Sequence, residues 1–206
     1  MQAFHNDPAI KDFYLTRVAA HRAADEVRHG YYWENGKGCA VGCTLHSSSH
    51  TAYETKLGIP CVLARLEDGI FEGLPSPEDQ QWPQAFLAAI PVGADLSLVW
   101  PRFFLRIATD IEHGLLRHVQ AAKHTRQKEA IEKVIQYYEK WVIEKKKPAA
   151  AAYTAAYAAY ADAADAYAAA FNKRKQEVRI WQSQILLALL QQAPVVTEMA
   201  PVAEGN

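Results

Sequence analysis

Four side chains of the kinds that zinc prefers lie within twelve residues of one another: Cys39, Cys43, His46 and His50. At about 100° per residue, all four would share one face of a helix, within roughly 60°. A straight helix would nevertheless spread them over about 16 Å, whereas the ligands of one ion lie about 2.0–2.3 Å from it. One helix can therefore offer only a pair, and a four-ligand zinc site requires a bend, for which Ser47–Ser49 is the natural place.

A catalytic set can also be built around the first cysteine. Cys39 follows Gly36-Lys37-Gly38, so it is expected near a helix N-terminus, where the dipole and Lys37 would lower the pKa of its thiol. His21 and Asp25 are one helical turn apart, and a carboxylate that orients an imidazole is typical of a general base. The alternative catalytic hypothesis therefore combines Cys39 as nucleophile with His46, His21 and Asp25.

A structural interpretation of the same residues stays open beside the chemical one. The cysteines can be small apolar residues of the core, and the histidines can be partly buried groups paired with their neighbours. The acidic run Glu67, Asp68 and Glu72 has no feature that would set a distance between its carboxylates. We expect that run to lie on a solvated helix face.

The elements that would position these residues are helices. Apolar residues at helical spacing, with Pro at starts and Gly at ends, predict helices over about 8–29, 39–58, 60–73, 76–91, 96–119 and 125–147. The first has apolar residues at helical spacing and a stop at Gly30; these residues are Ile10, Phe13, Tyr14, Val18 and Val27. Asn35-Gly36 predicts a turn in the loop before Cys39. No segment alternates as a half-buried strand does, so we predict an all-α fold, a compact multi-helix domain.

An alanine-rich segment follows Pro148, with fifteen alanines among residues 148–170. Its large residues recur at near-heptad spacing, which predicts a long helix over 148–192. The domain prediction is therefore a helical domain at 1–147, the long helix at 148–192 and a disordered tail at 193–206. The helix packs either on its own domain or on a partner, as a second copy of the chain or another protein.

Several segments resemble a bacterial family known only as hypothetical proteins. They read GKGCAVGCTLH at 36–46, YExxLGIP at 53–60, LEDxIFEGLP at 66–75 and IPVGADL at 90–96. The resemblance covers about residues 5–115, and an alanine-rich C-terminal helix is also common in such proteins. It implies a single bacterial or phage-borne soluble domain, and it brings no activity, cofactor or partner.

Composition excludes several classes of protein. The chain has 206 residues and a formal charge of −1, and no stretch approaches about 18 uncharged apolar residues, so we expect no membrane span. Three cysteines and the absence of a signal-peptide pattern favour a cytoplasmic protein. The basic helix at 117–147 interleaves its lysines with glutamates, which is typical of surface ion pairs, so no nucleic-acid ligand is expected.

These observations lead to two hypotheses about function. The first is a non-enzymatic helical protein that acts through protein–protein interaction or self-association, forming a homo-oligomer or binding another protein through 148–192. The alternative is a small metal- or thiol-dependent enzyme, a hydrolase or transferase, centred on the Cys39–His50 cluster with zinc as the possible metal. The two differ in whether the cysteines and histidines converge at an open surface or are scattered in the core.

Overall fold

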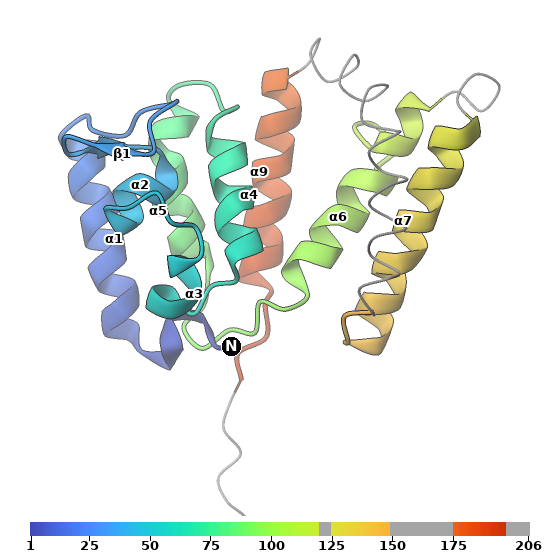
Figure 1. The fold of residues 1–206 in the computed structure, drawn as a ribbon, viewed down its shortest axis with the longest axis horizontal. Helices are drawn as coiled ribbons and strands as arrows, with labels where there is room; N and C mark the ends of the chain where they lie inside the picture. The colour runs from blue at the N-terminus through green and yellow to red at the C-terminus, as the bar shows by residue number, and fades with distance from the viewer. Residues whose placement is uncertain (120–124, 149–174, 197–206) are drawn as a thin grey trace, which may run out of the picture.

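The computed structural model describes residues 1–119, 125–148 and 175–196, and it confirms the all-α prediction (Figure 1). In chain order the elements are η1 (Ala3–Asn6), α1 (Pro8–Ala23), β1 (Trp33–Glu34), β2 (Lys37–Gly38), α2 (Ala40–Leu45), α3 (Ala52–Leu57), α4 (Cys61–Phe71), α5 (Glu78–Ala89), α6 (Val99–Thr109), η2 (Leu115–His118), α7 (Thr125–Glu144) and α9 (Lys175–Gln191). In these ranges, no helix combines the length and the apolar character needed to cross a bilayer.

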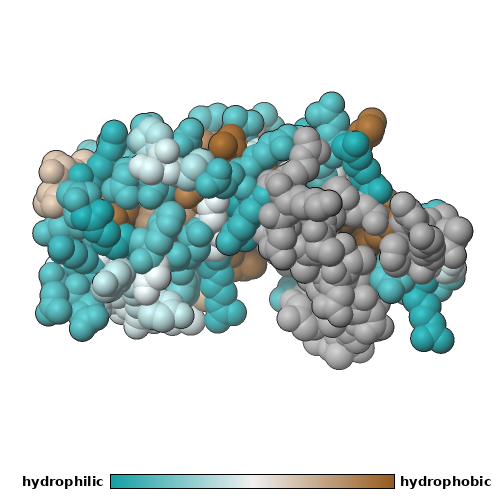
Figure 2. Space-filling view, turned by 90° about the horizontal axis from the view of Figure 1, so that it is seen from above, coloured by the Kyte–Doolittle hydropathy of each residue, from teal (hydrophilic) through white to brown (hydrophobic). Residues whose placement is uncertain are grey.

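Two hydrophobic cores organise the described helices. The larger core joins α1–α5 with α9 and with Val99 and Phe103 of α6, and the smaller one joins α6 with α7 and η2. Trp100 of α6 packs against both cores and donates a hydrogen bond from Nε1 to the Tyr138 hydroxyl at 3.0 Å. Figure 1 shows the resulting arrangement, with α9 beside α4 and with α6 leading away to α7. Seen from the hairpin end, the surface over the larger core is mainly hydrophilic (Figure 2).

Helix α1 ends six residues earlier than the sequence predicted. Asp7 caps its start, since the carboxylate accepts a hydrogen bond from Ala9 N at 2.8 Å. The helix stops at Ala23, and Asp25 adopts a left-handed backbone with φ of 55°. Val27 then forms an isolated parallel bridge with Gly38. The reason for the early end is tertiary: the chain leaves the helix to run beside β2, a pairing that helical periodicity cannot reveal.

A small β-hairpin that the sequence did not predict stands before α2. The predicted turn at Asn35-Gly36 is present, with φ of 51° and 82°, as in the type I′ turns that join two-residue hairpins. The hairpin lies so close to α2 that a Cβ on Gly42 would be 1.7 Å from the Tyr32 carbonyl oxygen, and one on Gly38 would be 2.6 Å from it. The glycines around Cys39 therefore serve close backbone packing.

The expected helix over 39–58 is interrupted, as the three serines suggested. Helix α2 ends at Leu45, His46 closes it in the left-handed region with φ of 53°, and α3 begins at Ala52. The expected helix over 96–119 is also divided. Asp110 follows α6 and accepts hydrogen bonds from the backbone N–H groups of Glu112 and His113, both at 2.9 Å, which turns the chain toward η2.

The C-terminal prediction is only partly open to comparison. Residues 149–174, the alanine-rich stretch, lie outside the described residues. Helix α9 packs on its own domain, where Leu186 and Leu190 are fully buried. The expected tail is ordered at its start, because Val195 bridges Ala94 and Asp95 N donates to the Pro194 carbonyl at 2.8 Å.

Candidate functional site

A chain of three titratable side chains joins the end of α1 to the end of α2. Glu26 Oε2 lies 2.6 Å from His21 Nδ1, and His21 Nε2 lies 2.7 Å from His46 Nε2. His21 is largely buried, with 12% of its side chain exposed, whereas His46 is exposed. The arrangement therefore leads from a carboxylate through a sheltered imidazole to an imidazole at the surface.

Neighbouring side chains fix the position of the His46 ring. Trp33 stacks on it, with ring centroids 4.4 Å apart and an interplanar angle of 10°. The His21 ring is nearly perpendicular to the same indole, with centroids 5.4 Å apart. Arg17 donates to the Thr44 carbonyl at 3.0 Å, so its charge lies near the end of α2. Partial burial, followed by the charges of Arg17 and His21, lowers the pKa of His46.

The two hydrogen bonds that link Glu26, His21 and His46 run in one direction when both rings are neutral. With both rings neutral, His21 Nδ1–H donates to Glu26, so His21 Nε2 accepts from His46 Nε2–H. His46 Nδ1 is then left with a lone pair. Such an arrangement can take up a proton at His46.

Sequence reasoning identified His21 and His46 but chose the wrong partner for His21. Asp25 is turned away and pairs with Arg28 instead. The prediction assumed that the helix continued, which would place i and i+4 on one face. Because α1 ends at Ala23, the side chain that reaches His21 is Glu26. The sequence contains no local signal for this early end of the helix, so it could not indicate Glu26 as the partner.

The two cysteines of the cluster are buried and donate hydrogen bonds to backbone carbonyls. Cys43 Sγ lies 3.3 Å from the Gly38 oxygen, and Cys39 Sγ lies 3.6 Å from the Tyr32 oxygen. Cys39 also caps α2, accepting from Gly42 N at 3.4 Å. Burial raises the pKa of Cys43 to about 12, and burial with the nearby Asp68 carboxylate raises the pKa of Cys39. Both groups are therefore neutral thiols, not the thiolate that the catalytic hypothesis needs.

The fourth predicted ligand is His50, which shares the Asp68 carboxylate with Cys39. Its Nε2 lies 3.1 Å from Asp68 Oδ2, on the far side of the bend that follows α2. The predicted set Cys39, Cys43, His46 and His50 thus does not converge on one point. Cys39 and His50 share Asp68, whereas Cys43 donates to the Gly38 carbonyl and His46 contacts His21. Within the described ranges, no group of three or more His, Cys, Asp or Glu side chains has the geometry of a metal site.

A buried carboxyl group lies on α4, where the sequence predicted a solvated face. Glu67 is fully buried, and the Tyr53 hydroxyl donates to its Oε2 at 2.7 Å. Its other oxygen, Oε1, has no hydrogen-bond partner among the described residues. Burial raises the pKa of Glu67 well above the ordinary value, more than the Tyr53 hydrogen bond lowers it. The group is closed to solvent and is part of the core.

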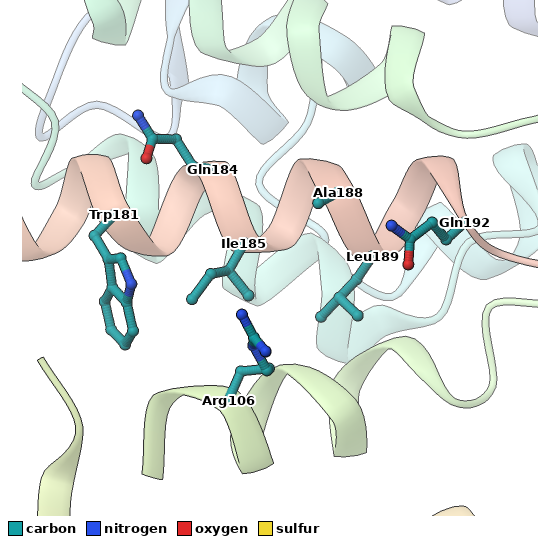
Figure 3. Close-up of a pocket in the computed structure, with 7 residues that line it drawn as sticks. All are labelled: Arg106, Trp181, Gln184, Ile185, Ala188, Leu189 and Gln192. Carbon is teal, nitrogen blue, oxygen red and sulfur yellow. The ribbon is translucent and has the colours of Figure 1, made fainter. Parts of the chain in front are cut away.

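A groove of about 360 Å³ lies between α6 and α9 (Figure 3). Arg106 extends into it from α6, opposite Ile185 and Leu189 of α9. The described residues that line the groove include no histidine, cysteine or carboxylate. It offers one cation and an apolar wall, and the chemical groups of the molecule lie elsewhere.

Comparisons with known proteins add no assignment. The chain matches no protein-family model, and neither the curated proteins nor the solved structures include a significant match. The resemblance described from the sequence therefore stays a prediction.

Proposed function

We propose that the protein is a non-enzymatic binding protein whose partner, another protein, docks along α1 and the hairpin segment. The observation that carries the proposal is the placement of exposed aromatic side chains. In the described part of the chain, the phenylalanine and tyrosine side chains that are at least half exposed are Phe13 at 53%, Tyr31 at 50% and Tyr32 at 66%. All three belong to α1 or to the residues directly before β1.

Contacts join Phe13 to Arg17 and His21 to His46 and Trp33, and the tyrosines directly precede Trp33 in the chain. Phe13, Arg17 and His21 succeed one another at single helical turns on α1, and the Arg17 guanidinium lies 4.5 Å from the centre of the Phe13 ring. His21 contacts the stacked rings of His46 and Trp33, and Tyr32 is the residue before Trp33. Phe13 belongs to the apolar residues whose spacing predicted the first helix, yet it is 53% exposed.

The types of these residues suit a protein partner. Aromatic side chains and arginine are enriched at protein–protein interfaces and at their energetic centres, and tyrosine and tryptophan lose little conformational entropy on binding. The alternative enzyme centred on Cys39 has less support, because both thiols of the cluster are buried hydrogen-bond donors.

Site-specific photo-cross-linking tests this proposal. A benzophenone amino acid placed at Tyr32 or at Phe13 should give one discrete adduct in cells that contain the natural partner. The matched control is Ile143 of α7, which is 79% exposed at the other end of the molecule. The adduct is identified by mass, and binding of the purified partner is then compared between wild type and Phe13→Ser/Tyr32→Ser. We expect the double variant to lose about 2 kcal/mol or more of binding free energy.

The outcomes are distinct. An adduct of twice the chain's mass identifies the partner as a second copy, and any other single mass identifies a different protein. The absence of an adduct at both Tyr32 and Phe13, or equal adducts at Ile143, would contradict the proposal.

A further inference from the structure

The hydrogen bond between His21 and His46 depends on the number of protons that the two rings carry. We propose that it is an acid-sensitive contact, which joins the end of α1 to the end of α2 in the neutral and singly protonated states and breaks when both rings are protonated. The conformational change belongs to this cluster alone. Its effect on a partner, described below, rests on the proposed function.

Only one hydrogen fits between the two Nε2 atoms. They are 2.7 Å apart, the distance of a hydrogen bond in which one nitrogen donates and the other accepts. In the neutral pair His46 donates to His21, and His21 donates from Nδ1 to Glu26. One added proton preserves the bond between the rings, because either ring can be the cation that donates to the lone pair of the other.

A second proton removes the acceptor of this hydrogen bond. Both Nε2 atoms then carry a hydrogen, and two N–H groups point at each other across 2.7 Å. The two positive rings, whose centroids are 4.9 Å apart, also repel each other. No change of tautomer restores the bond, because a protonated imidazole has no lone pair on either nitrogen. The rings therefore separate.

The charged groups around His46 set the pH range of the separation. Partial burial, followed by the charges of Arg17 and His21 on α1, lowers the pKa of His46 below its ordinary value of 6.5. Lys56 of α3 acts in the same direction, and Glu26, in the segment after α1, acts in the opposite one. The doubly protonated pair is therefore expected below pH 6.5.

The separation is local to the ends of the two helices. Arg17 still donates to the Thr44 carbonyl at 3.0 Å, which keeps α1 against α2. His46 is exposed and closes α2 in the left-handed region, so its ring can turn toward solvent while the buried residues of α2 stay in place. The stacked Trp33 indole can stabilise the His46 cation, but it cannot replace the lone pair that His21 has lost.

The consequence for docking rests on the proposed function. The contact between the rings links α1, which carries Phe13 and Arg17, to the stacked Trp33 beside Tyr32. A partner that touches both sides binds more tightly when they are already held together, since less conformational freedom is lost on binding. Acidification is therefore expected to weaken the binding of the partner.

Histidine NMR of the full chain between about pH 8 and about pH 4.5 tests the inference. The ring ¹⁵N shifts give the protonation of His21 and of His46, and the nuclear Overhauser effect between their ring protons reports the contact. We expect this signal to persist through the first protonation and to be lost with the second, below pH 6.5. Circular dichroism over the same range confirms that the helices remain folded.

The matched variant is His21→Gln. Its amide oxygen can accept from His46 Nε2–H whether or not His46 is protonated, so the contact with the His46 ring should persist to about pH 4.5. His50→Gln removes an imidazole that contacts Asp68, and it should leave the wild-type response unchanged. A contact that outlasts the protonation of both rings, protonation of one ring only down to about pH 4.5, or equal loss of the contact in His21→Gln would overturn the proposal.

The effect on docking is measured separately with the partner identified by cross-linking. Its affinity should fall between about pH 7.5 and about pH 5.5 for the wild type and change less for His21→Gln. Equal pH dependence of the two affinities would show that the contact does not regulate docking. If the contact breaks as expected and no partner is found, the proposed function is wrong and the acid-sensitive contact stands.

Discussion

Glu26 and Glu67 each contact a polar side chain, and their surroundings give the two carboxyl groups different roles. Glu26 lies at the surface with 32% of its side chain exposed and orients His21, which contacts the exposed His46. Glu67 is fully buried and accepts from Tyr53. A carboxylate that water reaches keeps its charge and can orient an imidazole, whereas burial favours the protonated carboxyl group. Exposure, rather than residue type, separates chemically available groups from structural ones.

The cysteines and histidines of the 39–50 segment follow the same division. Cys39 and Cys43 face the core, and His46 faces outward because α2 ends one residue before it in a left-handed turn. A short helix followed by a bend thus sends neighbouring residues to different environments. His46 is consequently more accessible to solvent than the two cysteines.

The largest expected effect concerns thiol reactivity. At pH 8 a thiol with a pKa of about 12 is ionised roughly 10³-fold less than an ordinary cysteine, so Cys43 should react with iodoacetamide about 10³-fold more slowly in the folded protein. Cys61, which is partly exposed, provides the comparison within the same chain. Peptide mass spectrometry over time gives the alkylation rates of Cys39, Cys43 and Cys61.

Unfolding in urea is the control, because it should make Cys39, Cys43 and Cys61 react at similar rates. If Cys39 or Cys43 were alkylated as fast as Cys61 in the native protein, the distinction between buried thiols and exposed imidazoles would fail. The enzyme hypothesis would then regain its nucleophile.

Two glycine-to-alanine substitutions provide the next test, and we expect them to change the free energy of unfolding in opposite directions. Gly42→Ala should destabilise the fold by about 3 kcal/mol, because the added methyl group would lie 1.7 Å from the Tyr32 oxygen and force the hairpin away from α2. Gly69→Ala in α4 should instead stabilise it by about 0.5–1 kcal/mol, since nothing lies within 4 Å of the added Cβ. Urea denaturation measures both changes. Equal effects at the two positions would show that the hairpin does not pack against α2 as described.

Local signals in the sequence were sufficient for the helical fold class and for the Asn35-Gly36 turn, since both depend on neighbours in the chain. They also singled out His21 and His46. The pairing of these residues, 25 positions apart, depends on how α1 and α2 cross, which periodicity does not specify. Glu26 was missed because the end of α1 is set by a bridge between Val27 and Gly38.

Glu67 shows the same limit of sequence reasoning for a residue that is buried. Glu67 lies among charged residues in the chain, which predicted a solvated face. In the structure it shares its face of α4 with Leu63, Ala64 and Ile70, and its donor Tyr53 comes from another helix. A residue that can be buried only with a distant partner resembles a surface residue until the fold is known.

Stability is expected to depend on pH through Glu67. A carboxyl group whose pKa is raised by folding holds its proton more tightly in the folded state, so the unfolded chain releases that proton first as the pH rises above about 4.5. The wild-type free energy of unfolding should therefore fall between pH 5 and pH 8, by about 1.4 kcal/mol for each unit by which the pKa is raised. Glu67→Gln keeps a neutral group that can accept from Tyr53, so this decline should be absent.

Urea titrations of wild type and Glu67→Gln at several pH values isolate the contribution of this group, because all other titrations are shared. The stability difference should move in favour of the glutamine variant as the pH rises. A difference that stayed constant between pH 5 and pH 8 would mean that Glu67 is ionised in the folded state. Burial would then no longer distinguish Glu67 from Glu26, and the Tyr53 hydrogen bond, rather than desolvation, would control the charge of the buried carboxyl group.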